Sequence, residues 1–175
     1  IRKALELASE ADHVHVAGIL ESLGELKILR GELIEAEQLL TRAVSLARER
    51  KRAWYEAQAL NSLARCHLEL GNTDEAEMAA NETIELCEKI GDRHYYSTAA
   101  VTRAECKLVK GEVEQCIQQL RTLEEQDLSN DFWVLGSIQR VRGLAALARG
   151  DKPLAVHHFN RSLTVFEAAS DVYHT

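Results

Sequence analysis

The sequence predicts an all-α protein, a right-handed superhelical solenoid built from antiparallel helical hairpins. Its composition is the first reason: 46% of the 175 residues are hydrophobic, but only 5% are aromatic and one is proline. Such Ala- and Leu-rich composition favours helices. The second reason is a segment centred on a glycine that recurs about every forty residues. Because one hairpin cannot bury its own apolar face, repeated hairpins stack and wind into a superhelix.

Four glycines mark the repeat, with spacings of 40, 40 and 39 residues: Gly31, Gly71, Gly111 and Gly150. Five residues after each glycine stands a small side chain, in order Ala36, Ala76, Cys116 and Ala155. Four residues further on stand Leu40, Ala80, Leu120 and Phe159. Since glycine readily adopts the left-handed conformation that ends a helix, each unit is predicted to be helix, tight turn, helix.

The helical patterns predict nine helices, at residues 1–10, 14–30, 33–50, 53–70, 74–90, 94–110, 113–126, 131–149 and 153–169. Acidic and capping residues open the second helix of each hairpin, where they suit the positive end of the helix dipole. We expect one solenoid over residues 1–175, cut from a longer protein. Its predicted parts are the second helix of a preceding repeat (1–12), four repeats (13–52, 53–92, 93–130 and 131–170) and the start of a following helix (171–175).

Two glycines fall inside predicted helices, seven residues before a turn glycine: Gly24 and Gly143. A glycine in a helix costs about 1 kcal/mol relative to alanine. We therefore expect both to mark places where the two helices of a hairpin approach closely.

These features together resemble tetratricopeptide repeats. The resemblance rests on leucine–small pairs such as Leu23-Gly24 and Leu63-Ala64, on the turn glycine, and on the small and bulky residues at fixed offsets after it. The chain departs from the usual pattern because its unit is longer, its aromatic is present only as Phe159, and the terminal proline is absent. The longer unit is similar to repeats in bacterial signal-responsive regulators and in some eukaryotic adaptor proteins.

The resemblance implies a non-enzymatic module that holds a protein segment or peptide in a concave groove lined by the first helices. By the family's offsets the groove residues are Glu21, Glu25, Gln58, Asn61, Arg65, Glu69, Thr98, Glu105, Ser137, Arg140 and Leu144. This row carries both signs of charge, which suits a mixed peptide or an amphipathic helix. The alternative is that these charges pair within the chain on a solvated face.

Chaperone-binding members of the family hold a partner's terminal carboxylate with basic and amide side chains. Only Asn61, Arg65 and Arg140 offer such groups here, whereas Glu25 and Glu105 would oppose an anionic ligand. The sequence therefore disfavours a carboxylate clamp.

Aromatic clusters begin three of the first helices: Trp54 with Tyr55, His94 to Tyr96, and Phe132 with Trp133. They are expected to plug the gaps between consecutive hairpins. If several rings are exposed together, they form instead a row of binding anchors, because Trp and Tyr dominate interface energetics.

No catalytic, metal or cofactor site is predicted. The sequence contains no phosphate-binding glycine loop, GxSxG elbow or HExxH motif. His13 and His15, and likewise His157 and His158, are spaced so that both members cannot face one metal from a helix. Cys106 and Cys116 occupy small-residue positions and are expected to pack in the core.

Charge and hydropathy limit the partners. The net charge is −7 and no basic run follows a phosphate backbone, so direct nucleic acid binding is not expected. No stretch is long and apolar enough for a membrane span. Scattered cysteines favour a reducing, cytoplasmic setting. Two further hypotheses remain: a sensing segment of a multidomain regulator, and homo-oligomerisation through terminal helix faces at Ile1, Leu5 and Leu163 to Phe166.

Overall fold

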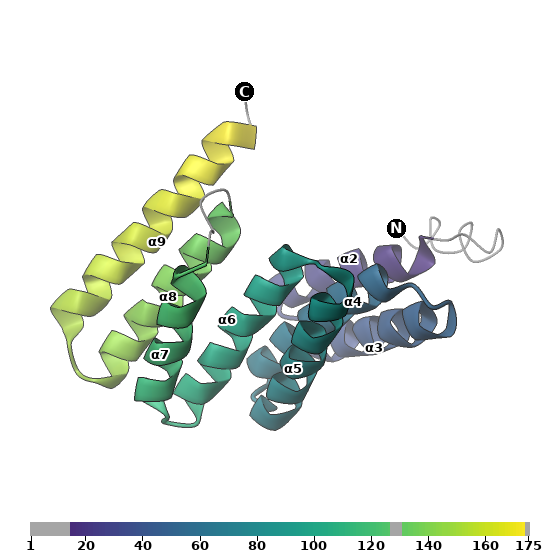
Figure 1. The fold of residues 1–175 in the computed structure, drawn as a ribbon, viewed down its shortest axis with the longest axis horizontal. Coiled ribbons are helices and arrows are strands. Elements are labelled where there is room, and N and C mark those ends of the chain that lie inside the picture. The colour runs from purple at the N-terminus through teal and green to yellow at the C-terminus, as the bar shows by residue number, and fades with distance from the viewer. Residues whose placement is uncertain (1–14, 127–130, 174–175) are drawn as a thin grey trace. The chain divides into compact units, whose positions relative to one another are not determined.

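The computed structural model describes residues 15–126 and 131–173, with side chains up to residue 169. These residues form helices and no strand (Figure 1). The helices are α2 (Val16–Leu29), α3 (Leu33–Glu49), α4 (Ala53–Leu70), α5 (Thr73–Ile90), α6 (Arg93–Val109), α7 (Val113–Glu124), α8 (Phe132–Ala148) and α9 (Lys152–Tyr173).

The chain divides into two compact units, residues 1–99 and 100–175. In the first unit α2 packs on α3, α3 on α4 and α4 on α5, and the two first helices α2 and α4 also touch. In the second unit α7 packs on α8 and α8 on α9. Consecutive helices run antiparallel within each hairpin, as Figure 1 shows for α2 with α3 and for α8 with α9. The division falls inside α6, within the expected repeat 93–130.

Helix positions agree with the sequence predictions to within two residues, apart from the end of α9. That helix continues to Tyr173 rather than ending at residue 169. Residues 171–173, which were expected to start a following helix, therefore belong to α9. The reason is local, since neither glycine nor proline follows residue 169 to stop a helix. The predicted helix at 1–10 and the segment 1–12 lie outside the described residues.

The turn glycines have the predicted left-handed conformation. Gly31, Gly71, Gly111 and Gly150 have φ values of 74°, 81°, 82° and 78°. Gly91 ends α5 in the same way, with φ of 74°.

The helical glycines lie where helices approach closely, as predicted. A Cβ on Gly24 of α2 would be 2.5 Å from Cγ of Leu40 in α3. A Cβ on Gly143 of α8 would be 2.4 Å from Cε1 of Phe159 in α9. These two hairpins therefore insert a bulky residue of the second helix against the backbone of the first.

The small repeat residues form the core between helices. Ala36, Ala76, Cys116 and Ala155 are all fully buried. All four cysteines of the chain are buried and free of disulfides. Burial raises the pKa of the thiols of Cys66, Cys87 and Cys116 to about 11, so these groups stay protonated at neutral pH. Cysteine thus serves here as a small hydrophobic residue.

Candidate peptide-binding site

A pocket of ≈ 470 Å³ lies in the first unit, between the first helices α2 and α4. Its wall is mostly apolar and aromatic, with a few polar groups. The lining residues are His15, Gly18, Ile19, Ser22, Leu23, Trp54, Tyr55 and Gln58. A largely apolar pocket with a few convergent polar groups has the character of a small ligand or side-chain site.

One wall of the pocket is the ring of Tyr55, which packs on the backbone of α2 at Gly18. A Cβ at Gly18 would lie 2.9 Å from Cε1 of Tyr55, so only glycine leaves room for the ring in this position. The hydroxyl of Tyr55 is also hydrogen-bonded to Nδ1 of His15, and the two rings meet edge to face.

Trp54 lies at the pocket rim, 48% exposed, and is held on several sides. Its Nε1 donates to Oδ2 of Asp92 at 3.1 Å. The ring centroid lies 5.1 Å from that of Tyr55 and 5.8 Å from that of Tyr95, both in edge-to-face geometry. The other oxygen of Asp92 accepts from the backbone N–H of Tyr95 at 2.9 Å and so caps α6.

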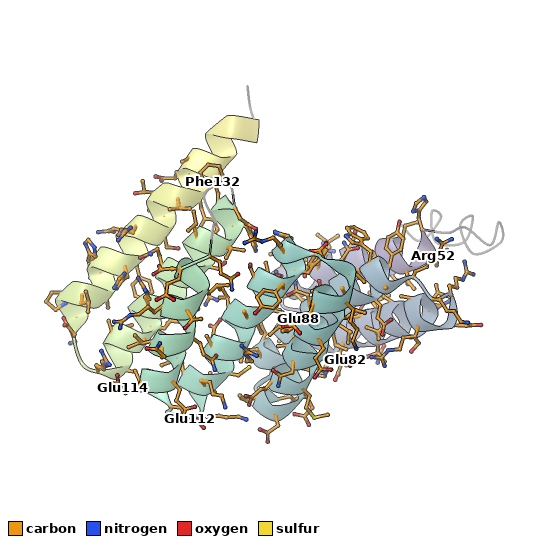
Figure 2. All side chains as sticks on the ribbon, in the orientation of Figure 1. Arg52, Glu82, Glu88, Glu112, Glu114 and Phe132 are labelled. Atoms are coloured by element: carbon orange, nitrogen blue, oxygen red, sulfur yellow. The ribbon has the colours of Figure 1, made fainter. Side chains whose placement is uncertain are left out.

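The aromatic clusters contain both rings that fill the space between helices and rings that are exposed. Tyr55 and Tyr95 are half-buried and fill space between first helices, whereas Trp54 is exposed beside them. In the second unit Trp133 is 55% exposed and packs edge to face on Phe166, with centroids 5.4 Å apart. Phe132, labelled in Figure 2 at the start of α8, is exposed as well.

Behind the pocket wall a carboxylate is buried. Glu21 is only 5% exposed and accepts hydrogen bonds from Oγ of Ser62 at 2.7 Å and from Nε2 of Gln58 at 2.8 Å. Burial raises the pKa of Glu21 because it penalises the charged form; the hydrogen bond from Ser62 opposes this and the neighbouring Glu25 adds to it. The remaining amide atom of Gln58, Oε1, is buried without a hydrogen-bond partner.

Several of the predicted groove residues contact one another across neighbouring first helices. In the first unit Arg65 pairs with Glu25 at 3.0 Å, and Oγ1 of Thr98 donates to Oδ1 of Asn61 at 3.0 Å. Gln58 donates a hydrogen bond to Glu21. Glu69 is exposed at the end of α4. Two of these predicted groove residues thus differ in environment, since Glu21 is buried and Glu69 is exposed.

In the second unit Arg140 holds Glu105 with two hydrogen bonds, of 2.8 Å and 2.6 Å. Ser137 and Leu144, the other predicted residues of this unit, are half-buried on the same helix as Arg140. A further pair joins Arg149 to Glu114, which Figure 2 labels in the first turn of α7. The four charges Glu25, Arg65, Glu105 and Arg140 are therefore paired within the chain, the alternative that the sequence left open.

Comparison with known families identifies the family of this chain. The chain matches the family model of the MalT-like TPR region over residues 1–174. The chain belongs to the MalT-like TPR family. This confirms the tetratricopeptide resemblance drawn from the turn glycines and the small residues after them.

Solved structures similar to this TPR chain have the same all-α repeat fold. One is a crystal structure of a substituted form of a putative kinesin light chain from Podosopora anserina, which has nearly identical TPR-like repeats. Its TM-score is 0.66 at 14% identity, and the match covers 97% of this chain and 85% of the other. A second structure of that protein has a TM-score of 0.64 at 14% identity and covers 96% and 84%. None of the curated proteins compared with the chain matches it.

A carboxylate clamp would face competition in this TPR chain. Arg65 and Arg140, two of the three groups that could hold a carboxylate, already bind Glu25 and Glu105. An anionic ligand would have to displace these acidic side chains and would then lie beside them.

Sequence reasoning missed part of the pocket. Gly18, Ile19 and Ser22 were not predicted, nor was the buried Ser62 that binds Glu21. Asp92 could have been found, because it stands directly before α6 after the helix-ending Gly91, at the position that favours a capping aspartate.

Among residues 15–126 and 131–173, no group of three or more His, Cys, Asp or Glu side chains could hold a metal ion. His157 and His158 meet edge to face with centroids 5.5 Å apart, whereas His13 lies outside the described part of the chain. No helix in the described ranges is long and apolar enough to cross a membrane.

Proposed function

We propose that this chain is a non-enzymatic interaction module that binds a protein segment or peptide against its first helices, with the pocket between α2 and α4 as anchor point. TPR-like repeats generally mediate protein interactions. The observation that carries the proposal is the ≈ 470 Å³ pocket whose rim is the half-exposed Trp54. Trp is enriched among the residues that contribute most to binding energy at protein interfaces.

The pocket is preorganised, which favours binding. Trp54 is held by Asp92 and by two tyrosine rings, so little side-chain entropy remains to be lost when a ligand covers it. Tyr55 is likewise fixed by His15 and by the absence of a side chain at Gly18.

The predicted groove residues are proposed as the surroundings of this anchor. In the first unit Glu25, Asn61, Arg65 and Glu69 would contact a ligand beyond the pocket, together with Thr98. Because Glu25 and Arg65 are partly exposed, a ligand can exchange hydrogen bonds with them at small cost. In the second unit Glu105, Ser137, Arg140 and Leu144 form the corresponding proposed contact region.

No catalytic or cofactor role is proposed. The buried thiols of Cys66, Cys87 and Cys116 have raised pKa values, opposite to what a nucleophilic cysteine needs. The carboxylates of Glu105 and Glu114 form ion pairs with Arg140 and Arg149.

The experiment is a selection from a displayed library of random peptides. The bait is the wild-type chain, and the enriched peptides are then tested on Trp54→Ala and on the matched control Trp133→Ala, which removes a similarly exposed indole in the second unit. Circular dichroism and thermal unfolding establish that all three are folded alike. We expect the peptides to bind the wild type and the control and to lose at least about tenfold in affinity on Trp54→Ala. Equal binding to Trp54→Ala would place the binding surface elsewhere.

A second candidate is a regulatory segment that senses a peptide or small effector. The match to the MalT-like TPR region supports it, as does the forty-residue unit that resembles signal-responsive regulators. Such a segment must transmit binding beyond its site. Hydrogen exchange with a selected peptide tests this: changed protection in residues 100–175 on binding at the pocket favours regulation, and changes limited to α2 and α4 favour a simple interaction module.

A further inference from the structure

The pocket between α2 and α4 has both apolar and polar lining groups. Ile19, Leu23 and Trp54 contribute aliphatic and aromatic surface, while Gln58 contributes an amide, and the part of the pocket at Gln58 is here called its inner end. A ligand group that contacts the apolar surface and also reaches the amide of Gln58 must have a long apolar stem and a polar head. Among protein side chains, lysine and arginine have this construction.

One buried acceptor at the inner end has no hydrogen-bond donor. Oε1 of Gln58 is buried and has no partner, because the Nε2 of the same amide is directed to Glu21. A buried acceptor without a donor costs free energy. The terminal torsion of a glutamine is broad, so this oxygen can turn toward a donor that enters the pocket.

The surroundings of the inner end are acidic. The carboxylate of Glu21 lies 2.8 Å from the Gln58 amide, and Glu25 follows one turn later on α2. Of the basic groups nearby, Arg65 is paired with Glu25 at 3.0 Å, and His15, which lines the pocket, is hydrogen-bonded to the hydroxyl of Tyr55. The same field reaches Tyr95, whose pKa is raised to about 12 by burial and by Glu21, Asp92 and Glu25.

We infer that this pocket takes a lysine or arginine side chain of the bound peptide, with the stem against Ile19, Leu23 and Trp54 and the cationic head at Gln58, in the field of the carboxylate of Glu21 buried behind it. The inference rests on the proposed function and specifies its ligand. A cation at the inner end supplies the donor that Gln58 lacks and stabilises the ionised form of Glu21.

The test uses four pools of fluorescein-labelled decapeptides whose central residue is lysine, arginine, norleucine or glutamate, with the same random mixture at the other positions. Norleucine has an apolar chain of similar length to the lysine stem, so the lysine-to-norleucine ratio of affinities measures the contribution of the charge. Binding is followed by fluorescence polarisation on the full chain. We expect the lysine or arginine pool to bind about tenfold more tightly than the norleucine pool.

Two variants locate the charge. In Glu21→Gln the carboxylate is lost while a hydrogen-bonding amide remains, so the lysine-to-norleucine ratio should fall several-fold. The matched control Glu114→Gln removes an exposed carboxylate in the second unit and should leave the ratio unchanged. Raising the salt concentration should weaken binding of the lysine pool more than that of the norleucine pool.

The outcomes separate this inference from the function on which it rests. If norleucine binds as tightly as lysine and both are lost in Trp54→Ala, the inference is wrong and the proposed function stands. Tightest binding of the glutamate pool would also overturn the inference. If no pool binds, or if binding survives Trp54→Ala unchanged, the proposed function fails.

Discussion

Asp92 connects the indole of Trp54 to the N-terminus of α6. One carboxylate oxygen, Oδ2, accepts from Nε1 of Trp54 at 3.1 Å, and the other, Oδ1, accepts from the backbone N–H of Tyr95 at 2.9 Å. Asp92 therefore caps α6 and also orients the indole of Trp54, which lies at the start of the preceding first helix, α4. The rim of the candidate pocket is thus positioned by the contact between consecutive repeats rather than by its own helix.

Replacing Asp92 should loosen Trp54 and weaken α6 together. We expect Asp92→Ala to lower the free energy of unfolding by about 1 kcal/mol through loss of the cap, and to make Trp54 more accessible to acrylamide. Fluorescence quenching in a Trp133→Phe background reports on Trp54 alone, since the chain has two tryptophans. Asp92→Asn is the control because asparagine also caps helices. Unchanged quenching in Asp92→Ala would show that Tyr55 and Tyr95 hold the ring unaided.

Glu21 should make stability depend on pH. Because its pKa is raised in the folded state, the folded chain binds the proton more tightly than the unfolded chain. The free energy of unfolding should therefore fall as pH rises through the ordinary value of 4.5 to the raised value, and stay lower above it. Glu21→Gln should remove this loss, so the variant gains stability relative to wild type at neutral pH and not at pH 3.

Urea unfolding followed by circular dichroism at several pH values measures the effect. The neighbouring Glu25 and Arg65 are unchanged in both proteins, so the difference between the two curves isolates Glu21. A difference that is constant from pH 3 to 8 would contradict the prediction. Glu21→Ala is expected to be worse at every pH, by about 1–3 kcal/mol, because the buried hydroxyl of Ser62 loses its partner.

Gly24 should not tolerate alanine, although alanine usually stabilises a helix. Its Cβ would lie 2.5 Å from Cγ of Leu40, a fully buried side chain. We expect Gly24→Ala to destabilise the chain by about 1–2 kcal/mol through overpacking. In a Leu40→Ala background the same change should cost less or become favourable. Thermal and urea unfolding of the four proteins give the coupling free energy, and a coupling of zero would exclude the contact as the cause.

Reversing one charge of the pair Glu105–Arg140 should destabilise the chain, and reversing both should not. Arg140→Glu places two carboxylates together in place of a bidentate pair, at an expected cost of about 1 kcal/mol. The double variant Glu105→Arg/Arg140→Glu should recover most of this loss. If these residues contact a ligand, the double variant also changes binding at nearly unchanged stability, which separates the two effects. Equal stability of the single and double variants would mean that the pair contributes nothing.

The outer face of α9 is expected to mediate any self-association. Val156 and Leu163 stand seven residues apart on this helix, and each is more than half exposed. Sedimentation equilibrium should show an average mass that rises with concentration for the wild type, and Leu163→Lys should suppress the rise. A monomeric mass at all concentrations would remove the oligomer hypothesis. The terminal residues Ile1 and Leu5, part of the same hypothesis, lie outside the described residues.

The repeat itself could be predicted because its signals are local. A turn glycine ends a helix through its own φ angle, as Gly31 and Gly111 do, and a helix buries the face that its own apolar spacing defines. Even the close approach at Gly24 was predictable, since a glycine within a helix needs a compensating reason. Local conformation and the forty-residue period thus determined the helices, the turns and the hairpin cores.

The site could not be predicted to the same depth, because its contacts join residues roughly forty positions apart on different hairpins. Which of Glu21, Glu25 and Arg65 is buried and which is paired depends on the distance and rotation between α2 and α4. The same holds for Trp54, whose orientation depends on Asp92 across the repeat boundary. Helical spacing places these residues on the first helices. Whether each one lines the pocket, joins an ion pair or becomes a buried acid depends on how one repeat packs on the next, because burial and pairing are properties of two surfaces together.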